Sequence, residues 1–467
     1  MPRVWYARIV MQHPDALQLK SAPPVQVLEA LDVGPDLPFG FAPLRAAAGA
    51  VNGVVLAERG HDLNLLASRP GGNILGAEAA AGAAGGREKG RCPMAGLTIF
   101  DRVWGGLLGG AVGDALGMPT ECLHWRDIDA IFGPFGRFED ITPAMMAEVN
   151  ARRRWKVDPA AVGRVTDDTV LADLLLDAIL ESDGRMAAHV FARAWEAFDR
   201  PVAGPGGESV NRLDRVHWIE RIPFYRNRLR DIPKRELGHG EANATNAIMY
   251  IAPVGLLCAG DPLKAELMAV DVTSVNQHGR PRDVAGGYAA ALAACFLPQA
   301  DAEAIVRTAL EHTRDQRRTG QMQAMVDLAR TCQTCRDFIR RYYDEILGRV
   351  LPFQDWQHEG SPSCTSWNSA EVLGPALGAL VITRGEDARE MILACARLGR
   401  DADTIARVAG GLIGAYRGAG AIPKEWADFV LARNPWLRLQ EKARRLADLV
   451  ERNLRGEVAS RRAVLGD

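Results

Sequence analysis

Glycine recurs at every fourth position of one apolar stretch, "DRVWGGLLGGAVGDALGMPTE", residues 101–121. The repeating positions are Gly105, Gly109, Gly113 and Gly117. Residues four apart share one face of an α-helix, and each interior glycine costs about 1 kcal/mol relative to alanine. Such a helix forms only where tight packing offsets this cost. We therefore expect the glycine face to lie directly against another backbone.

A second glycine stripe supplies a candidate for that backbone. Gly410, Gly414 and Gly418 repeat the four-residue spacing near the C-terminal end of the chain. We expect the helix that carries them to lie close against the first. Neither stretch has the G-x-G-x-x-G sequence of a dinucleotide site or the lysine of a phosphate-binding P-loop.

The pattern from about residue 98 onward is helical, with Pro, Gly and polar turns between apolar periodic segments. Convincing β alternation is scarce there. We predict an all-α domain, a compact multi-helix bundle, over residues 98–467. The expected helices include 99–117, 165–182, 186–199, 242–260, 262–276, 282–296, 301–313, 318–348, 368–383, 386–398, 402–419 and 436–454.

The first part of the chain has a different character. Residues 1–75 contain short extended candidates and a hairpin-like "AVNGVVLA", which are compatible with a small α+β appendage of unknown role. Eleven of the fifteen residues in "GAEAAAGAAGGREKG" are Gly or Ala. We predict a Gly/Ala-rich linker over residues 76–97, because 467 residues exceed the usual range of one domain.

The charge and hydropathy of the chain limit which classes of binding partner we expect. A net charge of -2 gives no global electrostatic case for nucleic acid or an anionic membrane, and no apolar stretch has the length of a membrane span. The first residues lack the pattern of a signal peptide. Eight sparse cysteines suggest reduced thiols, and we interpret the C-x-x-C pair Cys332 and Cys335 as ordinary helical cysteines. We expect a cytoplasmic monomer that binds neither nucleic acid nor membrane.

Two acidic clusters precede apolar helical segments. One reads T-D-D-T and contains Asp167 and Asp168; the other reads D-A-D-T and contains Asp401 and Asp403. Acidic residues in a first helical turn complement the helix dipole, so paired helix caps are one interpretation. If the two helix ends converge, four carboxylates need to protonate, separate or surround a cation. Oxygen ligands from Asp and Thr suit Mg²⁺ or Mn²⁺, which is the second interpretation.

Two further carboxylates follow the first glycine stripe. Asp114 and Glu121 lie near the C-terminal end of the predicted helix 99–117. An unpaired acid at that end opposes the helix dipole. This placement favours a functional or specifically bonded role for both residues.

The ordered segments "GGLLGGAVGDALGMPTE", "GRVTDDTVLA", "IAPVGLL" and "LGRDADTIARVAGGLIGAYRG" resemble the ADP-ribosylglycohydrolase family, which includes dinitrogenase reductase-activating glycohydrolase and ADP-ribosylhydrolases. The resemblance covers residues 100 to about 425. It implies an all-α bundle that holds two divalent cations, Mg²⁺ or Mn²⁺. The implied metal ligands are Thr166, Asp167, Asp168, Asp401, Asp403 and Thr404. The implied catalytic residues are Glu121 and Asp168.

The resemblance also implies a substrate-binding set. Its candidates are Asp114, Asn243, Asn246 and His278. The stretch "NATNAIMYIAPVG" falls where many family members have a Gly-rich loop before A-M-R-x-A-P, and Tyr250 stands in place of the arginine. The local match at His278 is loose, and a structural histidine is the other interpretation.

The expected function is metal-dependent hydrolysis of a ribosyl C1 linkage, in an ADP-ribosylated protein or a small ADP-ribose derivative. Two alternatives stay open at this point. One is a glycohydrolase of a small nucleoside or nucleotide. The other is a non-catalytic binding or structural protein that retains the fold.

Overall fold

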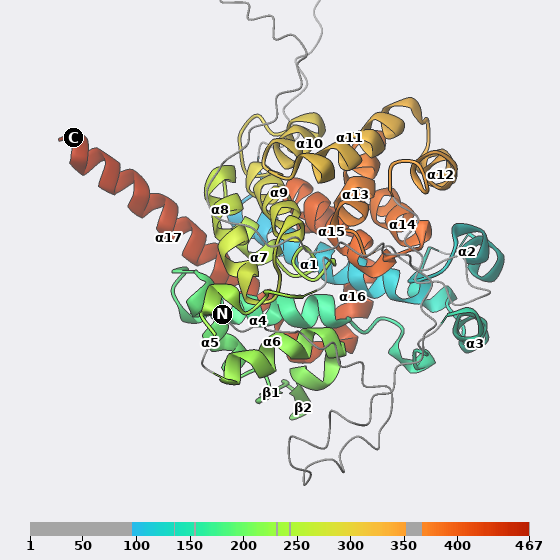
Figure 1. The fold of residues 1–467 in the computed structure, drawn as a ribbon, viewed down its shortest axis with the longest axis horizontal. Helices are drawn as coiled ribbons and strands as arrows, with labels where there is room; N and C mark the ends of the chain where they lie inside the picture. Colours follow the sequence, from blue (N-terminus) through green and yellow to red (C-terminus); the bar gives the residue numbers. More distant parts are fainter. Residues whose placement is uncertain are drawn as a thin grey trace, which may run out of the picture. The chain divides into compact units, whose positions relative to one another are not determined.

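The computed structural model describes residues 96–134, 136–153, 156–229, 232–241, 244–351 and 367–466. The predicted appendage over 1–75 and nearly all of the predicted linker over 76–97 lie outside these residues. Within them the chain is helical, with one sheet of two short antiparallel strands (Figure 1). The predicted all-α fold class is confirmed.

The helices and strands follow one another in chain order. The first half contains α1 (Ile99–Gly117), α2 (Trp125–Phe132), α3 (Pro143–Arg152), α4 (Asp167–Glu181), α5 (Ala188–Glu196), strands β1 (Pro201–Ala203) and β2 (Ser209–Asn211), α6 (Trp218–Leu229), α7 (Ala252–Leu257) and α8 (Pro262–Val272). The second half contains α9 (Arg280–Ala294), α10 (Ala302–Glu311), α11 (Gln316–Thr331), α12 (Cys335–Arg341), α13 (Ser369–Thr383), α14 (Ala388–Leu398), α15 (Ala402–Arg417), α16 (Lys424–Arg433) and α17 (Leu439–Leu465).

Most predicted helices occur within a few residues of their expected bounds, and α1 matches them at both ends. Three predictions were wrong in extent. The expected helix 436–454 ends eleven residues before the end of α17. The expected helix 318–348 is interrupted after α11, because Thr334 caps a new helix through a hydrogen bond from the Asp337 N–H. Among the described residues of the expected helix 242–260, only those of α7 are helical. Helices α2, α3, α6 and α16 were not among the expected segments.

Helices α1 and α15 form the central pair of the bundle (Figure 1). Their glycine faces meet backbone to backbone, as the sequence predicted. A Cβ atom placed on Gly109 would lie 2.1 Å from the carbonyl oxygen of Gly410, and one on Gly410 would lie 2.0 Å from that of Gly109. Gly105 meets Gly414 in the same way, and Gly113 meets Ala406. The pairs run in opposite directions along the two helices, so α1 and α15 are antiparallel.

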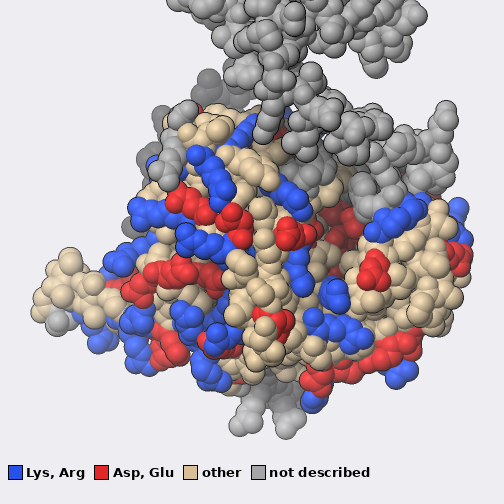
Figure 2. Space-filling model, turned by 90° about the horizontal axis from the view of Figure 1, so that it is seen from below, with Lys and Arg blue, Asp and Glu red and all other residues tan. Residues whose placement is uncertain are grey.

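The outer surface is polar and mixed in charge. Figure 2 shows acidic and basic side chains interspersed over one face. Helix α17 packs through Leu446 and Val450, and its C-terminal part extends away from the bundle (Figure 1). In the part of the chain that the structure describes, no helix combines the length and the apolar character that a membrane crossing needs.

Candidate metal and active site

The segment that carries Glu121 runs beside the start of α15. Glu121 follows α1 and a short 3-10 turn. The backbone N–H of Cys122 donates to the carbonyl oxygen of Arg400 at 2.7 Å, and the N–H of Arg400 donates to that of Leu123 at 3.2 Å. These two bonds hold Glu121 next to the first turn of α15.

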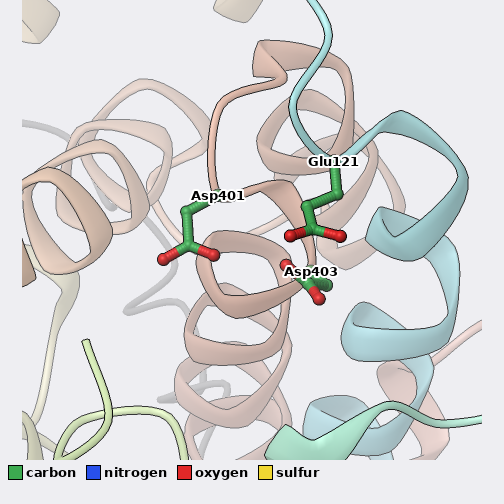
Figure 3. A group of neighbouring side chains, drawn as sticks. All are labelled: Glu121, Asp401 and Asp403. Atoms are coloured by element: carbon green, nitrogen blue, oxygen red, sulfur yellow. The ribbon is translucent and has the colours of Figure 1, made fainter. Parts of the chain in front are cut away.

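That turn carries the D-A-D-T group. Asp401 occupies the N-cap position of α15, and Asp403 lies in its first turn. Figure 3 shows the side chains of Glu121, Asp401 and Asp403 pointing toward one another, and each offers a carboxylate oxygen within 4.8 Å of the others. The hydroxyl of Thr404 donates to Asp401 Oδ1 at 3.1 Å. Three carboxylates from two distant segments therefore share one small volume.

The T-D-D-T group begins α4 and is held by α1. Thr166 is the N-cap residue, and its hydroxyl oxygen accepts from the N–H of Asp168 at 3.3 Å. The carboxylate of the fully buried Asp114 accepts from the N–H of Thr166 at 3.1 Å and from the N–H of Thr169 at 3.2 Å. The Thr169 hydroxyl also donates to Asp114. Asp114 therefore anchors the first turn of α4 to the last turns of α1.

The two acidic groups lie close enough to shift one another's titration. Burial raises the pKa of Asp168 well above its usual range, and Asp114, Asp167 and Asp401 raise it further. Burial, Glu121, Asp168 and Asp401 do the same for Asp403. Burial also raises the pKa of Asp167 and of Asp401 to about 6. The carboxylate cluster, as we call it below, consists of Asp114, Glu121, Asp167, Asp168, Asp401 and Asp403.

Two buried oxygens in this cluster lack a hydrogen-bond donor. Among the described residues, neither Asp168 Oδ2 nor Asp401 Oδ2 has a hydrogen-bond partner. Buried polar atoms are rarely left in this state, because the lost hydration is not recovered. Buried carboxylate oxygens without a hydrogen-bond donor suit a hard divalent cation. The donor set therefore fits metal ions.

A buried cation also lies near the cluster. Arg407, on α15, donates through Nη1 to the hydroxyl of Thr169 at 2.7 Å and through Nε to the carbonyl oxygen of Met249. Its charge opposes the effect of burial on the pKa of Asp114. One guanidinium does not balance six carboxylates, so full ionisation of the cluster needs further positive charge.

A family comparison agrees with this geometry. The ADP-ribosylglycohydrolase family model matches residues 95–457. The chain belongs to the ADP-ribosylglycohydrolase family.

Relatives of this chain include two proteins described as uncharacterized. YegU of Escherichia coli (strain K12) is 25% identical over 69% of this chain and 89% of its own length. A protein of Archaeoglobus fulgidus is also 25% identical, over 73% of this chain and 95% of its own length. A solved structure described as an ADP-ribosylglycohydrolase-related protein complex is 21% identical, with a TM-score of 0.47, and covers 75% of this chain and 99% of its own.

The predicted substrate-binding residues are dispersed. Asn243 lies outside the described residues. Asn246 is buried, and its Oδ1 accepts from Gln277 Nε2 at 3.1 Å, although the neighbouring Thr245 side chain faces Asp401. His278 Nδ1 lies 3.1 Å from the carbonyl oxygen of Gly238, at a surface hollow of about 460 Å³ that Arg280 and Asp315 also line. Among the described residues, His278 makes no hydrogen bond or ion pair with the carboxylate cluster.

Sequence reasoning missed the residues that support the cluster. Arg407 carries a recognisable signal, because it is a charged residue within the glycine-striped apolar helix. His217 has no recognisable sequence signal, yet its backbone N–H donates a hydrogen bond to the carboxylate of Asp167. Glu371 precedes Arg400 by 29 residues, and only the fold brings the two together.

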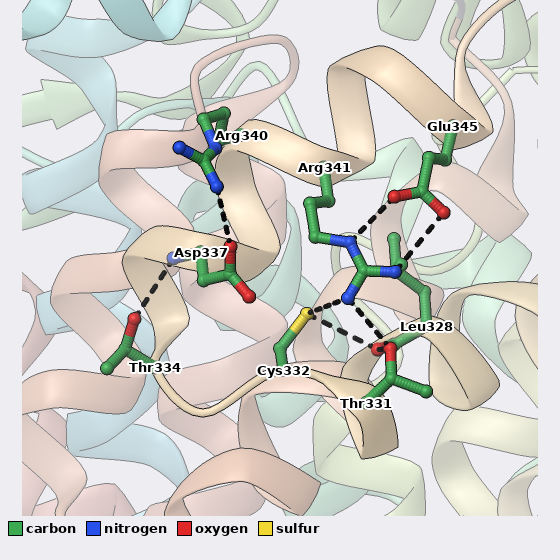
Figure 4. Close-up of polar contacts among 8 residues, drawn as sticks. All are labelled: Leu328, Thr331, Cys332, Thr334, Asp337, Arg340, Arg341 and Glu345. Atoms are coloured by element: carbon green, nitrogen blue, oxygen red, sulfur yellow. Dashed lines mark hydrogen bonds and ion pairs between the residues drawn. The ribbon is translucent and has the colours of Figure 1, made fainter.

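The C-x-x-C pair lies in another environment. Cys332 accepts from Arg341 Nη1 at 3.6 Å, and the same guanidinium binds Glu345 (Figure 4). Cys335 is buried at the start of α12, and burial raises the pKa of both thiols. Raised thiol pKa values disfavour the reactive thiolate, in agreement with the interpretation of these residues as ordinary helical cysteines.

Proposed function

We propose that this protein is a metal-dependent hydrolase that cleaves the ribosyl C1 linkage of an ADP-ribosylated protein or of a small ADP-ribose derivative. One observation carries the proposal. The T-D-D-T and D-A-D-T groups, 233 residues apart when measured from Asp168 to Asp401, lie close enough to raise one another's pKa values, and Glu121 lies beside the second group. Paired helix caps alone would leave those carboxylates uncompensated.

We propose that the oxygen donors of both groups hold two divalent cations, Mg²⁺ or Mn²⁺. Carboxylate and hydroxyl oxygens are the ligands that these hard ions prefer. The unpartnered oxygens of Asp168 and Asp401 support this assignment. The proposed ligands are Thr166, Asp167, Asp168, Asp401, Asp403 and Thr404.

When bound, such cations orient the ribose hydroxyls and lower the pKa of a water molecule. The side chains of the cluster would do the remaining work. Glu121, which is only partly buried, is proposed to carry a proton between the attacking water and the leaving group. Cleavage at C1 passes through an oxocarbenium-like state, and the negative charge of Asp168 would stabilise it.

Asp114 has a different proposed role. Its carboxylate accepts from two backbone N–H groups and one hydroxyl of the first turn of α4. We therefore assign Asp114 to holding α4 in place, although the sequence placed it among the substrate-binding residues. The substrate contacts of Asn243, Asn246 and His278 stay predictions, as do the cytoplasmic location and the monomeric state.

The test compares substrate classes with and without metal. The full-length protein, stripped with EDTA and reloaded with Mn²⁺, is incubated with ADP-ribosylated proteins, O-acetyl-ADP-ribose and free nucleosides. We expect metal-dependent release of ADP-ribose from one of the first two. Release of a base from nucleosides alone would favour the small-nucleoside alternative. A metal-loaded protein that is inert toward the whole panel would favour a non-catalytic role.

A further inference from the structure

Arg400, the residue before Asp401, has an unusual backbone conformation. Its φ angle is +62°, in the left-handed region that glycine occupies most easily. A non-glycine residue there is strained, and such strain persists where surrounding contacts over-determine the conformation. The side chain of Arg400 should therefore make contacts that compensate for this strain.

A buried ion pair meets that requirement. Arg400 Nε donates to Glu371 Oε1 at 2.6 Å, and the two side chains are 2% and 1% exposed. Glu371 lies in the first turn of α13, and the hydroxyl of Tyr342 donates to the same oxygen at 3.1 Å. A buried ion pair is weak evidence for stability, since an apolar pair of similar volume is often as good. Its value is more often the unique geometry that it imposes.

The backbone of Arg400 lies where the two acidic segments cross. Its carbonyl oxygen accepts from Cys122, the residue after Glu121, and its N–H donates to Leu123. Asp401 follows directly and caps α15. Rotation of this one residue would move Asp401 relative to both Glu121 and Asp403.

We propose that Arg400 and Glu371 are positioning residues, which set Asp401 and Asp403 opposite Glu121 from the α13 side. This inference rests on the proposed metal-dependent function. The pair does not touch the reacting atoms. It fixes a left-handed turn, and that turn sets where the second aspartate pair presents its oxygens.

The experiment removes the pair without leaving a buried charge. In the double variant Arg400→Gly/Glu371→Gln, glycine accepts the positive φ and both charges are absent. The matched control is Glu266→Gln/Arg314→Gln, which removes another ion pair with a buried glutamate, on α8. Calorimetry gives the Mn²⁺ dissociation constant of each protein, and circular dichroism gives its Tm.

We expect the Arg400→Gly/Glu371→Gln variant to fold and to bind Mn²⁺ about 10- to 100-fold more weakly than wild type, as changes behind metal ligands commonly do. The control should bind Mn²⁺ as wild type does. Wild-type affinity in the double variant, or an equal loss in the control, would overturn the positioning role.

Arg400→Lys provides a second measurement if the double variant does not fold. Lysine keeps the charge but loses the planar guanidinium, so we expect weaker Mn²⁺ binding with a Tm near that of wild type. Unchanged Mn²⁺ affinity in this variant would overturn the proposal. A wild-type protein that binds no Mn²⁺ would overturn the proposed function and this inference together, whereas equal binding by wild type and variant overturns the inference alone.

Discussion

The two aspartate pairs of the carboxylate cluster are alike in sequence and different in support. Asp167 and Asp168 begin α4, and that helix end is held by Asp114 of α1. Asp401 and Asp403 begin α15, and their segment is held by the buried Arg400–Glu371 pair and by backbone bonds to residues 122 and 123. Similar local motifs thus reach one site through unrelated long-range contacts.

This difference in support shows which properties of the site a local motif specifies and which depend on the fold. An acid and a threonine at a helix start specify a capped, negatively charged helix end. Where that end points depends on its anchor, which is α1 for the first pair and α13 for the second. The two helix ends can meet because α1 and α15 touch along their glycine faces.

The largest effect should come from removing one member of each pair. Asp168→Asn and Asp403→Asn should each weaken Mn²⁺ binding by about 100-fold or more, because each proposed ligand group loses a charged oxygen. Calorimetry measures the affinity, and Asp448→Asn, on the exposed face of α17, is the control. Unchanged affinity in either variant would mean that the two pairs do not form one site.

Glu121, which lies against the second pair, provides the next test. Glu121→Gln should lower turnover by about 10²- to 10⁴-fold, the usual contribution of general acid-base catalysis, with Mn²⁺ affinity near that of wild type. A parallel fall in Mn²⁺ affinity would make Glu121 a ligand beside Asp401 and Asp403. Wild-type turnover would remove it from the mechanism.

A third change acts on the contact that both pairs share. Gly109→Ala places a Cβ 2.1 Å from a backbone carbonyl oxygen and should lower the free energy of unfolding by about 3 kcal/mol through overpacking. Gly110→Ala, whose Cβ would meet Arg407 Nη1 at 3.5 Å, should change it by about 1 kcal/mol or less. Denaturant unfolding measures both variants. An equal free energy of unfolding for the two variants would mean that α1 and α15 can move apart to accommodate the added methyl group.

The smallest expected effect is a pH dependence common to both pairs. Asp167 and Asp401 each have a pKa of about 6 in the folded, metal-free protein, above the ordinary value of about 4. The folded state therefore holds more protons than the unfolded state between these values, so stability falls as pH rises through this window.

The Tm of EDTA-treated protein should accordingly rise when the pH is lowered from 7 to 5, while Mn²⁺ affinity falls. Asp167→Asn and Asp401→Asn should each remove part of this dependence. A Tm that falls steadily from pH 7 to pH 5, in wild type and variants alike, would contradict the expectation.

Features encoded by short spacings could be predicted from the sequence. The four-residue glycine repeats predicted the α1–α15 contact, and the two Asp/Thr groups predicted acidic helix starts at α4 and α15. The supporting contacts could not be predicted. The bond between Arg400 and Glu371 depends on a left-handed residue and on the packing of α13, neither of which has a local pattern.

In the α1–α15 contact, the distance between the two helices and their relative position along the helix axis are set by different features. A slide of α15 by one helical turn, about 5.4 Å, would place Gly105 opposite Gly410 and Gly109 opposite Ala406, so small residues would still face small residues. The repeat therefore sets the lateral distance between the helices but leaves a discrete axial slip open. The two backbone hydrogen bonds of Arg400 to residues 122 and 123 fix the position of α15 along the axis. The absent side chains of the glycines thus set how close the two helices lie, and two backbone hydrogen bonds set their position along the helix axis.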